Sequence, residues 1–192
     1  MNNQILVTYK SVTGFTKQYA KWIAEELDCT MMEWKDVSAK TMSEYDTVIF
    51  GGRFHAGFVD GLKKAKEIFT ESTAAKLIVF ATGATPHTAT EMIEEAWKNN
   101  LTADDLEKLP RFYMQSGLRY DKMPFGDKLM MKVFAAMVKR KKEKSEYEKA
   151  MEKALGHSYD LSSKEYIKPL VSYVAEAVSY THLRAHETDQ YL

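Results

Sequence analysis

Three short runs of aliphatic, β-branched and aromatic residues constrain the fold most, because each is apolar along nearly its whole length. They span Ile5–Tyr9, Thr47–Phe50 and Leu77–Ala81. A strand with one solvated face alternates apolar and polar residues, whereas a continuous apolar run is typical of a strand buried on both faces. These runs therefore predict the centre of a parallel sheet that helices cover on both sides.

The segments between and after these runs complete the pattern. Residues 16–27 place their apolar side chains on one helical face, and residues 59–69 do so less clearly. Residues 30–34 and 111–115 predict two further strands, and a terminal amphipathic helix is expected near the capping box at residues 162–165. Strands that alternate with helices predict an α/β fold, a doubly wound sheet of five parallel strands.

Length and composition favour a single domain, which we place at residues 1–177. The chain has 192 residues, of which 45% are hydrophobic, and its 27 basic residues balance its 27 acidic ones, so nothing indicates a nucleic-acid partner. Cys29 is the single cysteine, which excludes an internal disulfide, and we interpret it as a buried small hydrophobe. No apolar run approaches the roughly 20 residues of a spanning helix, so we expect a cytoplasmic protein.

The end of the chain departs from the preceding pattern. The amphipathic spacing of residues 167–174 stops, and residues 178–192 continue no face of that helix. This stretch looks like translated sequencing-adapter sequence, so we interpret it as a non-native tail and leave it out of functional reasoning. His182 and His186 lie within it and have no evident third ligand, so we predict no metal site.

A loop rich in hydroxyl groups joins the first strand to the first helix. It consists of Ser11, Val12, Thr13, Gly14, Phe15 and Thr16. Backbone N–H groups and the positive end of a helix dipole meet at such a point, and together with the hydroxyls they suit a phosphate group. Neither of the glycine-rich nucleotide signatures, G-x-x-x-x-G-K-[ST] and G-x-G-x-x-G, is present. The alternative is that the loop only caps the helix.

The loop resembles the phosphate-binding loop of flavodoxins, T/S-x-T-G-x-T, which Ser11, Thr13, Gly14 and Thr16 match. The resemblance implies a flavodoxin-like sheet with the strand order 2-1-3-4-5. It also implies non-covalent binding of FMN and a role in electron transfer, as an oxidoreductase whose chemistry belongs to the flavin.

The two other loops that a flavodoxin would use follow the third and fourth strands. In doubly wound folds, ligands bind beyond the carboxyl ends of the strands. The resemblance implies that the flavin ring lies between these loops, with Phe54 and His55 covering it. The alternative is that Phe54 belongs to the core and that His55 is a solvated loop residue. Arg53 is expected either to stabilise an anionic reduced flavin or to form an ion pair. The candidate residues of these two loops are Gly52, Arg53, Phe54, His55, Gly57, Thr82, Gly83, Ala84 and Thr85.

Residues 116–158 are too long for an ordinary loop, and we interpret them as an insertion after the fifth strand. A helix is expected over residues 126–142, with a stripe of apolar side chains flanked by basic ones. Such a helix can lie on an anionic membrane surface, dock on a partner or cover the sheet. The apolar stripe is Leu129, Met130, Val133, Phe134, Met137 and Val138, and the flanking basic residues are Lys128, Lys132, Lys139, Arg140, Lys141 and Lys142.

Residues 117–120, Gly-Leu-Arg-Tyr, and the following Phe-Gly-Asp-Lys-Leu-Met-Met-Lys run at 125–132 resemble the insertion of the menaquinone-dependent protoporphyrinogen IX dehydrogenase family. This resemblance implies an FMN enzyme that oxidises protoporphyrinogen and passes electrons to quinone, bound peripherally at the inner face of the membrane. It implies that Arg119 and the lysines pair with propionates and that the methionines contact apolar ligands. A binding module without enzyme activity is the remaining alternative, and no catalytic residue is assigned.

Overall fold

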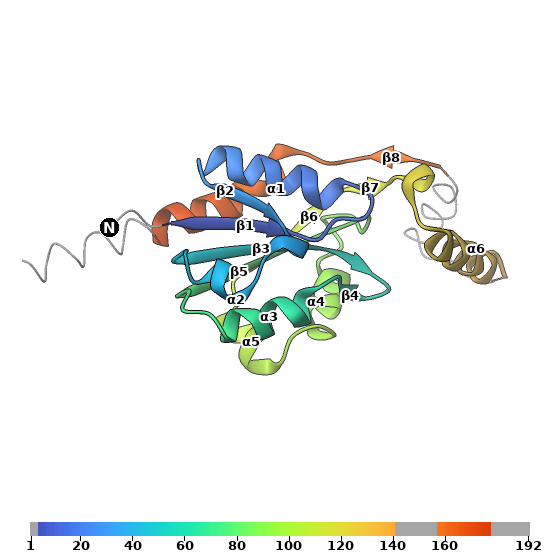
Figure 1. Cartoon of the computed structure of the whole chain (residues 1–192). Coiled ribbons are helices and arrows are strands. Elements are labelled where there is room, and N and C mark those ends of the chain that lie inside the picture. Colours follow the sequence, from blue (N-terminus) through green and yellow to red (C-terminus); the bar gives the residue numbers. More distant parts are fainter. Residues whose placement is uncertain (1–3, 141–156, 178–192) are drawn as a thin grey trace, which may run out of the picture.

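In the computed structural model, which describes residues 4–140 and 157–177, a twisted parallel sheet lies between two layers of helices (Figure 1). Its strands run in the order β2-β1-β3-β5-β6, and a short sixth strand, β4, pairs with β3. This arrangement confirms the expected order 2-1-3-4-5. The parallel strands are β1 (Ile5–Tyr9), β2 (Thr30–Glu33), β3 (Thr47–His55), β5 (Lys76–Gly83) and β6 (Arg111–Gln115).

The helices divide between the two faces of the sheet (Figure 1). α1 (Phe15–Glu26) and the helix over residues 168–177, which follows a short 3-10 turn at Lys164–Ile167, cover one face. The opposite face carries the short α2 (Ala39–Met42) together with α3 (Leu62–Thr70), α4 (Thr90–Lys98) and α5 (Ala103–Lys108). A further 3-10 turn, Trp34–Asp36, follows β2.

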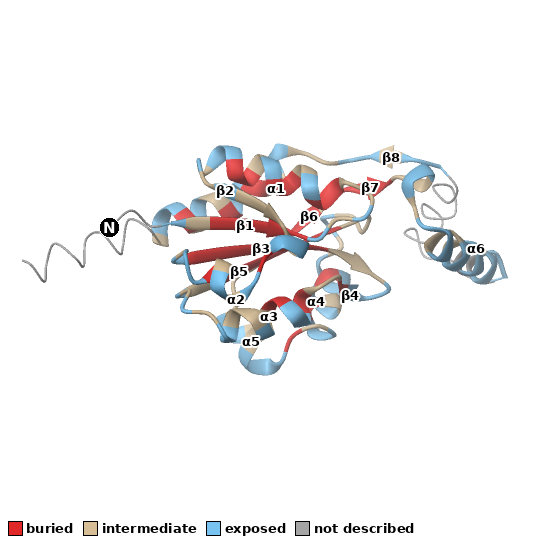
Figure 2. Ribbon diagram, viewed as in Figure 1, coloured by how far each residue is buried: buried red, intermediate tan, exposed pale blue. Residues whose placement is uncertain are grey.

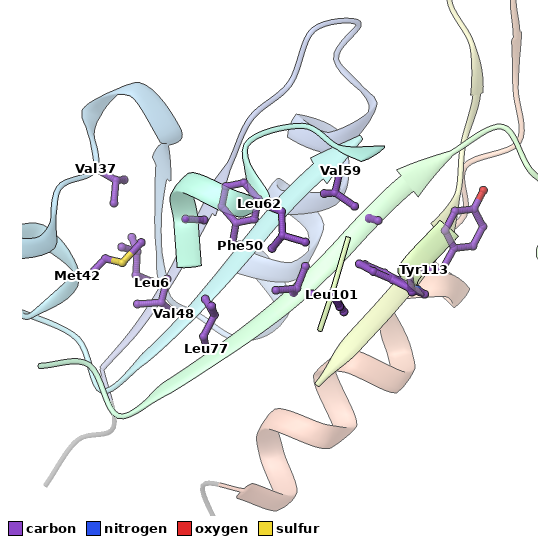
Figure 3. Close-up of a cluster of buried hydrophobic side chains, with 14 of the residues drawn as sticks. Leu6, Val37, Met42, Val48, Phe50, Val59, Leu62, Leu77, Leu101 and Tyr113 are labelled. Carbon is purple, nitrogen blue, oxygen red and sulfur yellow. The ribbon is translucent and has the colours of Figure 1, made fainter. Parts of the chain in front are cut away.

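Successive residues of the central strands supply the two cores on opposite faces of the sheet. Leu6 and Leu77 pack toward α3 and α4, in the cluster that Figure 3 shows. Val7 and Ile78 pack toward α1 and the terminal helix, whose Leu170 is also fully buried. Figure 2 shows the buried residues concentrated along the strands and the inner faces of the helices. Burial of each such aliphatic side chain contributes about 1.5–3 kcal/mol, which explains why these runs are continuously apolar.

β3 and β5 extend further than predicted, so residues expected in loops belong to strands. β3 continues through His55 because Phe54 and His55 pair antiparallel with Val59 and Phe58 of β4 (Phe58–Val59). The two residues between these strands, Ala56 and Gly57, have φ values of 50° and 84°. Positive φ at both positions is typical of a tight hairpin turn. α3 consequently begins at Leu62, three residues later than expected.

The insertion adds a strand and a helix at the carboxyl edge of the sheet, and the strand pairs with residues just after the insertion (Figure 1). β7 (Gly117–Leu118) pairs antiparallel with β8 (Tyr159–Asp160), and a 3-10 turn at Tyr120–Lys122 leads to α6 (Phe125–Arg140). α6 confirms the helix predicted from residue 126. Lys141, Lys142 and the tail at 178–192 lie outside the described residues.

One expectation for the predicted helix was that it covers the sheet. In the structure, α6 does not cover the sheet. Leu129, Val133 and Met137 are 53%, 53% and 60% exposed, so these three side chains of its apolar stripe face solvent. No helix within residues 4–140 and 157–177 combines the length and apolarity needed to cross a bilayer.

Candidate functional site

A cavity of about 340 Å³ lies where the strands end, between the sheet edge and the insertion. The structure brings most of the predicted site residues to its wall, from three separate segments of the chain. Those that line it are Thr13, Phe15, Thr16, Arg53, Phe54, His55, Gly57, Thr82, Gly83, Ala84 and Thr85. Four predicted residues do not line it, namely Ser11, Val12, Gly14 and Gly52.

The loop before α1 turns at Gly14, whose φ of 94° lies in the left-handed region. Gly14 occupies the N-cap position and has no side chain with which to cap the first turn of the helix. Its own N–H donates to Ser11 Oγ at 3.2 Å, so Ser11 shapes the loop from outside the cavity. The alternative that the loop only caps α1 is therefore met by glycine at the N-cap position, without a hydrogen bond from a hydroxyl side chain.

Thr16 and Thr82 join the first loop to the end of β5. Their hydroxyl oxygens lie 2.9 Å apart in a hydrogen bond, and both residues are about 1% exposed. A buried hydroxyl pair of this kind holds α1 in a fixed position against the strand. The pair therefore shapes one wall of the cavity and satisfies the Thr16 hydroxyl within the protein.

Gly52 does not line the cavity, and its role is to allow close packing of the neighbouring backbone. A Cβ atom at Gly52 would lie 2.7 Å from the carbonyl oxygen of Asp60 and 2.7 Å from Val59 Cγ1. Only glycine leaves room for the β4 strand and the chain that follows it to lie this close to β3.

Arg53 forms an ion-pair network, which was one of the two roles expected for it. Its Nε donates to Asp60 Oδ2 at 2.6 Å and its Nη1 donates to Asp127 Oδ2 at 2.7 Å, and the three side chains are only 15–22% exposed. Burial acts to lower the pKa of Arg53, but the hydrogen bonds to the two carboxylates outweigh it and raise that pKa. Arg53 is therefore charged, and its charge is compensated by two aspartates.

His55 joins the same cluster from the last position of β3. Its Nε2 lies 3.3 Å from Asp127 Oδ1, and its side chain is 32% exposed. His55 is therefore a half-buried strand residue beside a carboxylate, and its expected place in a solvated loop is wrong. Asp127 contacts both His55 and Arg53, so the cluster attaches the first turn of α6 to the end of β3.

Phe54 is shared between the core and the cavity. Its ring packs edge-on against Trp97 at 5.0 Å between centroids and lies 5.9 Å from the ring of Tyr113. Tyr113 in turn donates its hydroxyl hydrogen to the carbonyl oxygen of Thr85 at 2.7 Å. These contacts fix an aromatic wall between the end of β3 and the middle of β6, next to the third predicted loop.

The insertion supplies the outer wall of the cavity. Met123, Met130 and Met131 line it together with Asp127, and Arg119 reaches it from the residue after β7. Methionine side chains are flexible and polarizable, and they adapt to flat or irregular apolar ligands. The insertion side of the cavity therefore combines three methionine side chains with two charged groups.

Several lining residues were not predicted from the sequence. Tyr113 is the middle residue of the predicted fifth strand, so its position in the sequence gave no signal that it lines the cavity. Met92, Ile93 and Ala96 belong to α4, a helix that the sequence analysis did not place. Within the part of the chain that the structure describes, no group of three metal-ligating side chains is present.

Comparison with known families decides how this fold and site are classified. A family model described as the flavodoxin domain matches residues 6–145, which is most of the chain. The chain belongs to the flavodoxin domain family. The match includes all three loops of the cavity and reaches past α6.

Solved flavodoxin-fold structures resemble this flavodoxin-domain chain at low identity. The flavodoxin, WrbA-like protein of Agrobacterium tumefaciens is 16% identical over 66% of this chain and 88% of its own, with a TM-score of 0.40. Oxidised Flavodoxin 1 of Bacillus cereus is 16% identical over 72% and 99%, with a TM-score of 0.39. Oxidised Flavodoxin 2 of Bacillus cereus is 22% identical over 57% and 84%, with a TM-score of 0.37. No curated protein matched the chain.

Proposed function

We propose that this flavodoxin-domain protein binds FMN non-covalently in the cavity at the carboxyl edge of the sheet and acts as an oxidoreductase in electron transfer. One observation carries the proposal: the start of α1 and the ends of β3 and β5 line a single cavity. Its volume of about 340 Å³ falls in the range of small-molecule sites. Membership of the flavodoxin domain family supports the choice of a flavin.

The residues present fit the two ends of FMN. At the phosphate end, the turn at Gly14 and the first N–H groups of α1 offer donors and the positive end of the helix dipole. At the ring end, the aromatic wall of Phe54 and Tyr113 stands beside the chain segment of Gly83 to Thr85. When bound, FMN supplies transfer of a hydride or of single electrons, and the protein positions it.

The chain's own groups then limit what reaches the cofactor. Met130 and Met131 stand on the insertion side of the cavity, where they exclude water and admit apolar molecules. Asp127 keeps α6 in place through its hydrogen bond from Arg53. The proposed division of labour is a polar sheet edge that holds the cofactor and an apolar helix that faces the redox partner.

Titration of the purified protein with FMN, followed by quenching of flavin fluorescence, tests the proposal. We expect saturable binding of one FMN per chain. Thr13→Glu, which adds a negative charge at the phosphate end, should abolish binding. Thr70→Glu, an exposed position at the end of α3, is the matched control and should bind as the wild type does. A colourless protein that takes up no FMN would instead indicate a binding module without a flavin.

A second candidate function is oxidation of protoporphyrinogen with quinone as the electron acceptor. The observation that favours it is the apolar methionine wall of the cavity, formed by Met130 and Met131 of α6 and by Met123 just before it. The FMN-loaded protein should then convert protoporphyrinogen to protoporphyrin faster than the spontaneous reaction when menaquinone is added. Equal rates with and without the protein, across several quinones, would remove this candidate and leave FMN binding untouched.

Peripheral contact with the cytoplasmic face of a membrane is proposed for α6. Phe125, Leu129 and Val133 expose 82%, 53% and 53% of their surface next to Lys128 and Lys132. Apolar side chains flanked by basic ones suit an anionic lipid surface. The protein should sediment with vesicles that contain phosphatidylserine. Val133→Glu should reduce this, whereas Phe58→Glu, at an equally exposed apolar residue on β4, should not.

A further inference from the structure

Arg119 is a residue of the insertion that contacts the proposed phosphate loop. The β7–β8 pair brings it there, since Arg119 follows β7 directly and its Nη2 donates to Asp160 of β8 at 3.1 Å. Its Nη1 donates to the carbonyl oxygen of Thr13 at 3.2 Å, and its Nη2 also donates to Gln18 Oε1 at 2.8 Å. These bonds attach a guanidinium group to the loop before α1.

The guanidinium also lies over the ring of Phe15 in this loop. Its central carbon is 4.0 Å from the centroid of the Phe15 ring, in a cation–π contact. A Cβ atom at Gly14 would lie 2.8 Å from Arg119 Nη1, so glycine at this position leaves the space that Arg119 fills. Arg119 is 23% exposed and also lines the cavity, so it is held firmly and yet reaches the ligand space.

The loop itself carries no charge to balance a phosphate. Residues 11–16 have only apolar, hydroxyl and glycine side chains. Arg119 has five N–H donors, and the described residues accept three hydrogen bonds from it. Two donors are thus left for a further acceptor. A guanidinium group also matches the geometry of a phosphate better than an ammonium group does.

We propose that Arg119 binds the phosphate group of FMN and makes this site prefer FMN to riboflavin. The inference rests on the proposed function and assigns a specificity-determining role to a residue outside the phosphate loop. The strand pair β7–β8 then has a function of its own, because it delivers a cation that the loop lacks.

Dissociation constants for FMN and for riboflavin, which lacks the phosphate, test this role in three proteins. Arg119→Met keeps an unbranched apolar stem and removes the charged head group, and it should weaken FMN binding about 10- to 100-fold. Riboflavin binding should change less than about threefold, a size typical of small packing changes. Arg119→Lys should recover part of the affinity for FMN. Arg111→Met is the control, because Arg111 is equally exposed at 23% but lies at the start of β6.

Equal weakening of both ligands by Arg119→Met would show a structural role and overturn the inference. Unchanged FMN affinity would overturn it as well, while the proposed function would stand. A wild-type protein that binds neither ligand would refute the proposed function itself.

The wild-type protein offers a test that does not depend on folding of a variant. Its affinity for FMN should fall as salt rises from 50 to 500 mM, whereas its affinity for riboflavin should stay constant; these concentrations span roughly a threefold change in screening length. The same salt dependence for both ligands would overturn the inference.

Discussion

Asp127 of the inserted helix accepts a hydrogen bond of 2.7 Å from Arg53, at the carboxyl end of the central strand. The two residues are 74 positions apart in the sequence. The same carboxylate lies 3.3 Å from His55. This cluster links α6 to the sheet edge through largely buried charged groups, and it sets the position of the apolar wall of the cavity.

Removing the carboxylate should loosen α6. Asp127→Asn keeps the size of the side chain and weakens its bond from Arg53, which retains Asp60. We expect local opening of residues 125–140 to become easier by about 1–3 kcal/mol, the cost of a charged hydrogen bond. Hydrogen exchange of these amides should accelerate accordingly. Glu25→Gln, in the exposed pair with Lys21, is the control and should change little. Unaltered exchange in Asp127→Asn would refute the anchoring role.

Thr16 and Thr82 should behave as a coupled pair. Thr16→Val or Thr82→Val alone leaves a buried hydroxyl unpaired, so each should lower the free energy of unfolding by about 1–3 kcal/mol. The double variant removes both polar atoms and should lose less than the sum of the two. Thr8→Val is the control, because Thr8 Oγ1 is buried and has no hydrogen-bond partner among the described residues. It should leave stability unchanged or raise it, as urea denaturation can measure.

Gly14→Ala should impair both the fold and the ligand site. Alanine would have to adopt the φ of 94° that Gly14 has, and its Cβ atom would press against Arg119 Nη1. We expect a loss of about 1–2 kcal/mol in stability from the backbone alone, together with weaker FMN binding. Gly126→Ala is the matched control, since a Cβ atom there meets nothing within 4 Å. It should be neutral or stabilising, because alanine favours a helix. Equal effects of the two substitutions on thermal unfolding would contradict this interpretation.

Cys29 should react slowly in the native protein. Cys29 is half-buried and not the fully buried residue that the sequence predicted. This partial burial, with a smaller contribution from the charge of Asp28, raises the pKa of the Cys29 thiol to about 11. Its pKa in the unfolded chain is about 8.5, so folding should lower the thiolate fraction at pH 8 on the order of 100-fold. Iodoacetamide at pH 8 should therefore alkylate the native protein far more slowly than the protein in urea. Similar rates in the two states would show that Cys29 is not shielded.

The same shift fixes a pH dependence of stability. A raised pKa in the folded state means that the contribution of the thiol is fully present below about pH 8.5 and is lost as pH rises toward 11. The difference in free energy of unfolding between the wild type and Cys29→Ser should change in this window. A constant difference between pH 7 and pH 10.5 would contradict the assignment.

The sheet was predictable because its central strands are buried on both faces. The runs at residues 5–9 and 111–115 match β1 and β6, and the strand order follows the expected one. The antiparallel β4 was not predicted, since its two residues are too short to show a period. The positive φ of Ala56 left no signal either, because alanine rarely occupies that region.

The candidate site was predictable only where its residues are local in sequence. The loop at residues 11–16 joins a strand to a helix, and that context indicates a phosphate site without reference to the rest of the chain. The contacts of Asp127 with Arg53 and of Arg119 with Thr13 join distant segments. No periodicity or local motif encodes which side chains of an insertion will reach a loop more than 70 residues away, so these contacts required the structure.

Amide chemical shifts of the ¹⁵N-labelled protein, recorded as FMN is added, test the central claim most directly. The account predicts saturable shifts concentrated in residues 11–16 and 83–85, with little change near Cys29 at the opposite edge of the sheet. Shifts that cluster elsewhere, or a spectrum that FMN leaves unchanged, would contradict it.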